Sequence, residues 1–315
     1  MCIHLNLMIF TKIIRGFISA ALFGVSHLTS ADEIITLGTK GGPSLLNEKR
    51  LPQSTAFIKN DKIYLFDAGY GASLRLVQSK APLKNLDSIF ITHLHSDHVA
   101  DYPALLLNAW NSGLNHNIAV YGPVGTESMT KGVWDTFSRD IDLRVKDEGK
   151  PDLRQIVTAK DIQEGPVLKN DDVEISALFV PHPPFNSDEA LAYKIQSGGK
   201  TIVITGDMID NSQIIEFAKD ADYLISEVVL VSGVENLANR IGNGSTLAKA
   251  IISHHTTAED VGKIAKQANV KHLVLTHLVP ADDPSITDDV WINEVRKQYS
   301  GPVTVSKDLQ RFEVK

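Results

Sequence analysis

The chain contains 315 residues, of which 43% are hydrophobic and 22% are charged, and its formal net charge is −7. This composition indicates a globular protein, long enough for one large or two small domains, and no other compositional class. The negative charge disfavours a surface that binds nucleic acid or another polyanion.

The first 31 residues predict a secretory signal peptide. Lys12 and Arg15 precede an apolar run at 17–25, and small residues at 29–31 then provide a cleavage site. The apolar run is about half of the roughly 20 residues that span a bilayer, so we expect no stable membrane anchor. We therefore expect residues 1–31 to be removed during export.

Cleavage after Ala31 leaves residues 32–315, which we predict to form a single domain in the periplasm or outside the cell. Either Met1 or Met8 can start the signal peptide. The only cysteine, Cys2, is removed with it, so the mature chain has neither disulfides nor a thiolate ligand. Basic residues fall from 31 to 29 against 38 acidic residues, which makes the mature charge −9. Any metal site must then consist of nitrogen and oxygen ligands.

The predicted elements of the mature chain begin with a strand at 34–37 that leads into the glycine-rich segment 38–43. No helix with a Lys-Ser/Thr signature follows, so we expect a tight turn rather than a phosphate-binding loop. Strands at 56–59 and 62–66 are joined by an Asn-Asp turn and form a predicted hairpin. Asp67 ends this hairpin, where it can hold a loop or a ligand residue in place.

A dense group of histidines follows the next apolar run. Residues 86–91 have the sequence LDSIFI and predict a buried strand. The segment 92–98, THLHSDH, then places three histidines and one aspartate within six positions. His93 and His95 are two residues apart, so in an extended chain their side chains project to the same side. This density of ligand residues at a strand end predicts a metal site, and a helix is expected at 99–110.

The middle of the chain is less informative. A strand is predicted at 118–121 and a helix at 125–138, whereas 140–161 is charged and poorly periodic. His116 lies in a polar loop and is expected to be exposed. Three stretches are expected to shape the substrate pocket although they carry no interpretable motif: 110–117, 134–154 and 234–245.

Potential ligands follow three strands of the second half. Strands are predicted at 173–180, 190–196, 200–204 and 273–276. His182, Asp207 and His277 come just after the first, third and fourth of these strands. Open α/β sheets build their sites at the carboxyl ends of strands, so we expect these side chains to meet there.

The form His-x-His-x-Asp-His resembles the metal motif of the metallo-β-lactamase-fold hydrolase superfamily, and the later ligands match it position by position. This resemblance implies a four-layer αβ/βα sandwich with the metals at one edge, between the two sheets. It implies two metal sites with these ligands: His93, His95 and His182 for one ion, Asp97, His98 and His277 for the other, and Asp207 as the bridge. Such ligands suit two divalent ions, Zn²⁺ first and Mn²⁺ or Fe²⁺ next.

Two further residues resemble one branch of the superfamily. Glu227 ends a predicted strand at 222–227, and His255 lies in the segment 253–258 that opens a predicted helix. These features are similar to the branch that holds RNase Z, the tRNA 3′-end endonuclease, and a group of secreted arylsulfatases. In that branch an acid stands behind a histidine that meets the substrate. An imidazole held by a glutamate stays protonated, which suits an anion contact or proton donation.

The resemblance therefore implies three catalytic residues, which are Asp97, His255 and Glu227, with Asp97 also a ligand. The structural alternative for His255 is that it only caps the helix that follows, together with Thr256 and Thr257. His254 and His272 have no such match, and we expect both to be structural.

The predicted function is an exported binuclear hydrolase whose metal-bridging hydroxide cleaves a small anionic ester, either an aryl sulfate or a phosphodiester. Asp207 disfavours β-lactamase activity, because the β-lactamases of the superfamily lack the bridging aspartate. RNase Z proteins carry a protruding arm for tRNA between the third histidine and this aspartate, but only 24 residues separate His182 from Asp207.

The alternatives are an RNase Z-like nuclease, a lactonase, and a non-catalytic periplasmic binding protein, which should have lost ligands. The sequence leaves the oligomeric state open, a homodimer included.

Overall fold

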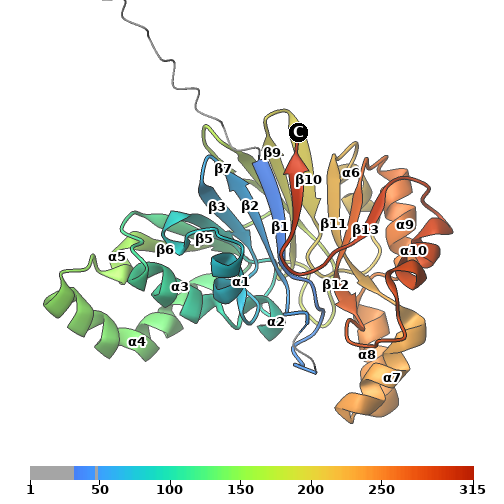
Figure 1. Ribbon diagram of the computed structural model, residues 1–315, viewed down its shortest axis with the longest axis horizontal. Coiled ribbons are helices and arrows are strands. Elements are labelled where there is room, and N and C mark those ends of the chain that lie inside the picture. Colours follow the sequence, from blue (N-terminus) through green and yellow to red (C-terminus); the bar gives the residue numbers. More distant parts are fainter. Residues whose placement is uncertain (1–31, 47–48) are drawn as a thin grey trace, which may run out of the picture.

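Two seven-stranded mixed sheets lie at the centre of the protein (Figure 1). The computed structural model describes residues 32–46 and 49–315, so the predicted signal peptide at 1–31 lies outside the described residues. Helices flank both sheets, which gives the four-layer αβ/βα sandwich that the resemblance implies (Figure 1). Within the described part of the chain, no helix is long and apolar enough to cross a lipid bilayer.

The first sheet comes mainly from the first half of the chain and has the order β14-β1-β2-β3-β4-β5-β6. Its strands are β1 (Asp32–Gly38), β2 (Ser54–Lys59), β3 (Lys62–Phe66), β4 (Leu86–Phe90), β5 (Ile118–Gly122), β6 (Val157–Asp161) and β14 (Gln310–Val314). The predicted hairpin of β2 and β3 is confirmed. Asn60 and Asp61 at its turn have φ angles of 49° and 64°, the left-handed geometry that two-residue hairpins favour.

The second sheet has the order β13-β12-β11-β10-β9-β8-β7. Its strands are β7 (Gly165–Lys169), β8 (Glu174–Phe179), β9 (Leu191–Ser197), β10 (Lys200–Ile204), β11 (Tyr223–Val229), β12 (Leu273–Val279) and β13 (Val303–Val305). The strands β7 to β10 are antiparallel neighbours, whereas β10, β11, β12 and β13 run parallel.

Alternating residues of each central strand build two different cores. In β3, Ile63 and Leu65 belong to the core beneath the helices, whereas Tyr64 and Phe66 belong to the core between the sheets. Because side chains alternate along a strand, one apolar strand can serve both layers. The ring of Phe66 lies 5.7 Å from that of Tyr193, which comes from β9 of the other sheet. Continuous apolar runs such as the one in β3 are therefore buried on both faces.

Helices connect the strands and cover the outer faces. Those of the first half are α1 (Ala72–Gln78), the 3₁₀ turn η1 (Leu83–Asn85), α2 (Ser96–Val99), α3 (Tyr102–Asn111), α4 (Thr126–Glu148) and α5 (Leu153–Ile156). Those of the second half are α6 (Ser212–Phe217), α7 (Val231–Ile241), α8 (Gly244–His254), α9 (Ala258–Gln267) and α10 (Asp288–Arg296). In Figure 1, α9 and α10 lie beside the second sheet, whereas α7 and α8 project from one end of the molecule.

Two helices have bounds that differ from the expected ones. The charged stretch after residue 140 continues α4 to Glu148, because Arg144 pairs with Asp140 and Glu148 one turn away on either side. Such pairs support a solvated helix that has few apolar positions. The helix expected at 99–110 is confirmed as α3, but it begins only at Tyr102, and the separate short helix α2 precedes it. Pro103 stands in the first turn of α3, where its missing N–H costs nothing.

Candidate metal centre

The predicted ligands meet at one edge, between the two sheets. His93 and His95 follow β4 of the first sheet, whereas His182 follows β8 and Asp207 follows β10 of the second. All four are brought together because the carboxyl ends of their strands converge at this edge.

His277 reaches the same edge by a different route from the one expected. It lies inside β12 rather than beyond its end. The pairing of β11 with β12 shifts between Ser226 and Val228, where β12 has one residue more than its partner, and His277 has a φ angle of 44°. A bulge of this kind re-aims a side chain, which explains how a residue within the strand faces the site.

The first group of candidate ligands contains three imidazoles and one carboxylate. His93 Nε2 lies 3.0 Å from His95 Nδ1, and His182 Nε2 lies 3.2 Å from the same nitrogen. Asp207 Oδ2 is 3.7 Å from His93 Nε2 and 3.9 Å from His182 Nε2. One donor atom from each residue thus faces a common point.

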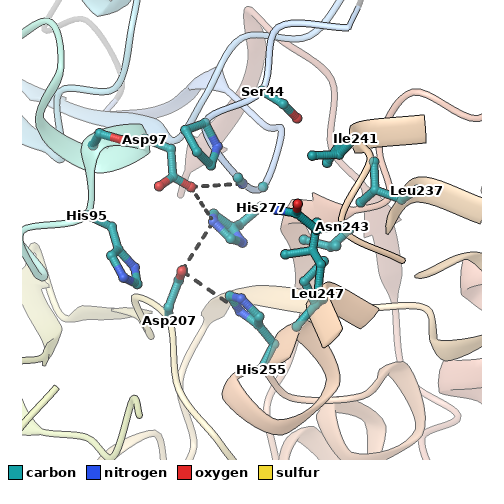
Figure 2. A pocket seen from close by; sticks show the side chains of 16 residues that line it. Ser44, His95, Asp97, Asp207, Leu237, Ile241, Asn243, Leu247, His255 and His277 are labelled. Carbon is teal, nitrogen blue, oxygen red and sulfur yellow. Dashed lines mark hydrogen bonds and ion pairs between the residues drawn. The ribbon is translucent and has the colours of Figure 1, made fainter. Parts of the chain in front are cut away.

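The second group contains Asp97, His98 and His277. Asp97 Oδ2 lies 3.2 Å from His277 Nε2 and 3.8 Å from His98 Nε2. Asp207 Oδ2 is 3.2 Å from His277 Nε2 and 3.4 Å from His98 Nε2, so the same oxygen faces both groups. Figure 2 shows Asp207 between His95, His277 and His255. This is the position that a carboxylate shared by two ions requires.

The protonation of three of the histidines suits metal ligation, whereas at His98 burial is outweighed by the carboxylates of Asp207 and Asp67, which raise its pKa. Burial lowers the pKa of His93, His95 and His182, that of His182 to about 4, which favours the neutral imidazole that a metal needs. Burial opposes ionisation of Asp97 and Asp207, but the neighbouring histidines outweigh it and hold the pKa of both carboxyl groups below the usual value.

Three buried polar atoms of the cluster have no hydrogen-bond partner within the described residues. They are Asp207 Oδ1, His98 Nε2 and His277 Nδ1. Leaving such an atom unsatisfied costs about 1–3 kcal/mol, and a fold rarely tolerates several together. The donor types and two of these atoms, His98 Nε2 and Asp207 Oδ1, fit divalent metal ions, whereas His277 faces the carboxylates with its other ring nitrogen, Nε2.

Asp67 fixes the orientation of the histidine segment. Its carboxylate accepts hydrogen bonds from the backbone N–H and the hydroxyl of Thr92, at 2.8 and 2.9 Å. It also lies 2.8 Å from His98 Nδ1, which leaves His98 Nε2 turned toward the cluster. A carboxylate behind a ligating histidine sets its tautomer and raises its basicity.

The group that holds His182 was not predicted from the sequence. Its Nδ1 lies 2.9 Å from the carbonyl oxygen of His254, the last residue of α8. The Nδ1–H must donate there, so Nε2 is left as the ligand atom. The backbone of His254, and not its side chain, therefore belongs to the site, a role that no residue type could reveal.

The glycine-rich segment holds Asp97 and leaves room for His277. The N–H of Gly42 donates to Asp97 Oδ2 at 2.8 Å. A Cβ on Gly41 would come within 2.7 Å of His277 Nδ1 and 2.4 Å of Val279 Cγ2. The buried Lys40 ammonium donates to the carbonyl oxygens of both glycines and so fixes this turn. The predicted tight turn beside the metal ligands therefore has a specific steric reason.

The partly buried His255 and the buried Glu227 form a pair next to the candidate ligands. His255 Nδ1 lies 2.9 Å from Glu227 Oε2, and Glu227 Oε1 accepts from the backbone N–H groups of Met208 and Thr256. Burial opposes the charged imidazole, but Glu227 outweighs it and raises the pKa of His255 to about 9. The helix-capping alternative for His255 was wrong, because Thr257 caps α9 by accepting from the N–H of Asp260.

A cavity of about 330 Å³ opens above these residues. Its polar end contains His95, Asp97, Asp207, His255 and His277. Four apolar residues of α7 and α8 line the opposite side, and we call them the apolar wall: Leu237, Ile241, Leu247 and Ile251. In Figure 2, the labelled members of this wall lie across the cavity from His95 and Asp97.

Of the three stretches expected to shape the pocket, only 234–245 lines this cavity. Trp110 is buried among the helices of the first sheet and donates to the carbonyl oxygen of Pro151. Two further histidines of the described part of the chain, His116 and His272, also lie outside the site. His116 is exposed and contacts the carbonyl oxygen of Leu86, and His272 contacts the hydroxyl of Thr304.

Comparison with known proteins adds a family and a fold. Residues 33–258 match the family model described as "Anti-Pycsar protein Apyc1". Ribonuclease Z of Mycobacterium bovis (strain BCG / Pasteur 1173P2) is 27% identical over 285 residues, which cover 90% of this chain and 98% of that protein.

Two solved structures share the fold. The metallo-β-lactamase-fold protein YhfI from Bacillus subtilis is 24% identical with a TM-score of 0.67, and the match covers 90% of this chain and 100% of that one. Zn²⁺-bound PqqB from Methylobacterium extorquens is 15% identical with a TM-score of 0.67, again over 90% of this chain and 100% of that one. These likenesses establish the metallo-β-lactamase fold, whereas the arylsulfatase-like branch stays a prediction.

Proposed function

The chain belongs to the family described as Anti-Pycsar protein Apyc1, and from this premise we propose that it is a metal-dependent hydrolase of a small phosphodiester. The observation that carries the proposal is the position of Asp207. One of its oxygens faces two groups of nitrogen and oxygen donors, and His255 Nδ1 lies 3.8 Å from the same oxygen.

Seven side chains would hold two divalent metal ions. They are His93, His95 and His182 for one ion, Asp97, His98 and His277 for the other, and Asp207 for both. When bound, such ions make hydroxide available from water at neutral pH and neutralise negative charge on the ester oxygens. Zn²⁺ is the first expectation, with Mn²⁺ and Fe²⁺ compatible with the same donors.

His255 would act on the substrate directly. Because Glu227 keeps the imidazole protonated, His255 can donate a hydrogen bond to a non-bridging oxygen or a proton to the departing oxygen. Glu227 would hold the charge and the orientation of this imidazole without touching the substrate. Asp97 would combine its role as a ligand with orientation of the glycine-rich turn through the Gly42 N–H.

A phosphodiester is favoured over the other esters by the comparisons and by the size of the site. The relative from Mycobacterium bovis is a ribonuclease by name, and ribonucleases cleave phosphodiesters. A long RNA is disfavoured because the chain is acidic and because only β9 and β10 occupy the stretch between His182 and Asp207. An aryl sulfate presents nearly the same oxygens, so it is the second substrate to test.

The test is a substrate panel with purified protein loaded with Zn²⁺ or Mn²⁺. The panel contains bis(p-nitrophenyl) phosphate, the p-nitrophenyl ester of thymidine 5′-phosphate, p-nitrophenyl sulfate, a lactone and a tRNA precursor with a 3′ trailer. We expect the two small diesters to be cleaved fastest. Preferred cleavage of the sulfate, the lactone or the tRNA precursor would assign the protein to that substrate instead. Absence of any turnover, with less than one ion bound per chain, would favour a non-catalytic binding protein.

We also propose that the protein works in the periplasm or outside the cell. The support is the basic, apolar and small-residue pattern of residues 1–31. N-terminal sequencing of the native protein should find Asp32 or a residue near it first. Native protein that still begins at Met1 or Met8 would contradict export by this route.

A further inference from the structure

The cavity above the candidate metal centre has two chemically different ends. One end carries the candidate ligands and His255, whereas the other is the apolar wall. Leu237 and Ile241 are four residues apart on α7, and Leu247 and Ile251 are four residues apart on α8. Residues at this spacing share one face of a helix, so each helix turns an apolar pair toward the cavity.

The apolar wall is more than the core of the helix pair. The buried core that joins α7 and α8 to the sheet consists of Val229, Val234, Leu237, Ala238, Ala248 and Val279, and Leu247 and Ile251 pack against it with only part of their surface buried. Leu247 and Ile251 are only half-buried and Ile241 is 38% exposed, although all three face the cavity. Apolar surface left open to water forfeits the stabilisation of about 25 cal/mol per Å² that burial would give. A ligand that covers this surface would recover it.

Contacts at both ends hold the wall at a fixed distance from the metal centre. On α7, Arg240 pairs with the buried carboxylate of Asp282 at 3.1 Å. On α8, the carbonyl oxygen of His254 accepts from His182 Nδ1. His255 follows directly as the residue after α8, one turn beyond Ile251. A ligand that reaches the metal centre therefore meets the wall at the same time.

We propose that the apolar wall binds the organic group of the ester, an aryl or heteroaromatic ring, while the anionic group lies at the metal centre. Leu247 and Ile251 are then the residues that set substrate specificity. This inference rests on the proposed function for the anionic end of the ligand. It adds that esters with a flat apolar group are preferred over esters of small alcohols.

The test compares two ligands that share one anionic group, phenylphosphonate and methylphosphonate. Their dissociation constants are measured by calorimetry on the zinc-loaded protein, so no turnover is needed. Burying a phenyl ring against the wall should make phenylphosphonate bind at least about tenfold more tightly than methylphosphonate. Equal affinities would overturn the inference.

Variants of the apolar wall then test whether its residues cause the preference for phenylphosphonate over methylphosphonate. Leu247→Asn keeps the size of the side chain but makes it polar, and it should reduce the preference to about twofold or less while methylphosphonate binds as before. Ile251→Ala, a milder change, should act in the same direction and serves if Leu247→Asn does not fold. Val231→Asn is the matched control, because Val231 lies on α7, is 45% exposed and does not line the cavity. A preference that persists in Leu247→Asn and Ile251→Ala would overturn the assignment.

The outcome separates this inference from the proposed function. A protein that cleaves no diester but prefers phenylphosphonate would support ring binding by the apolar wall and contradict the proposed diesterase activity. An active diesterase that binds both phosphonates equally would refute ring binding by the apolar wall and leave the proposed function intact.

Discussion

The metal centre and the apolar wall face each other across one cavity, yet they are built in different ways. The candidate ligands lie just after strands, on the short helix α2 or at the bulge in β12, and hydrogen bonds to Asp67, Gly42 and the His254 carbonyl fix the orientation of several of them. The apolar wall lies on a helix pair that projects from the sandwich and packs mostly against itself (Figure 1). The elements of the sandwich therefore hold the candidate metal ligands in place, whereas the proposed binding of the organic group depends on the α7–α8 helix pair, which projects from the sandwich.

The largest expected effect tests the metal side of this comparison. Asp207→Ala removes the one carboxylate that faces both ligand groups, so metal content should fall below one ion per chain and hydrolysis below detection. Metal analysis and turnover of the purified variant measure both effects. Circular dichroism should show a retained fold, because Asp207 supports no strand. Two bound ions and normal turnover would refute the role of Asp207 as a bridge.

A somewhat smaller effect is expected at the His255–Glu227 pair, which lies between the metal centre and the apolar wall. His255→Ala should lower kcat by about 10² to 10⁴ while both ions remain bound, because it removes a charged donor and no ligand. Glu227→Gln should act in the same direction but more weakly, since the imidazole remains. The loss should shrink for esters with good leaving groups if His255 donates a proton, and persist if it only binds the anion.

His254→Ala is the control for this experiment. It removes a neighbouring imidazole but keeps the carbonyl oxygen that accepts from His182 Nδ1, so kcat should change by no more than about twofold. A His255→Ala enzyme that is fully active on every ester would exclude a catalytic role for His255.

A third prediction concerns the turn beneath the metal centre. Gly41→Ala places a Cβ within 2.7 Å of His277 Nδ1, so this ligand must move. Displacing a ligand in this way should cost about 10- to 100-fold in metal affinity, as measured by competition with a chelator. Gly132→Ala is the matched control, because its Cβ would meet no atom within 4 Å. Equal metal affinity in both variants would show that the turn tolerates a side chain.

The smallest effect is expected at the attachment of the apolar wall. Arg240→Ala leaves the buried Asp282 carboxylate unpaired and loosens α7, so KM for an aromatic diester should rise a few-fold. The values of kcat and metal content should stay unchanged, because no ligand contacts Arg240. Arg240→Lys should restore most of the KM. A fall in metal content would instead show that the wall and the metal centre are not separable.

The amino-acid sequence by itself determined most of the sandwich and the identity of the candidate ligands. Apolar runs of strand length located the strands from β1 to β5 and from β8 to β12, because a strand buried on both faces needs such a run. Ligand residues just past several of these strands then indicated that the site lies at one edge of the sheets, at the carboxyl ends of the strands. These inferences work because they depend on residue type and short spacing.

Tertiary structure decided the features that depend on the backbone or on distant contacts. The bulge that turns His277 into the site, the His254 carbonyl behind His182 and the Gly42 N–H on Asp97 use main-chain groups, which every residue has. The stretch predicted at 234–245 contains Leu237 and Ile241 of the apolar wall, but Leu247 and Ile251 escaped prediction for a related reason. An apolar pair at helical spacing, such as Leu247 and Ile251, has the same pattern whether it is buried in a core or faces a cavity, and only its distance from the metal centre distinguishes the two.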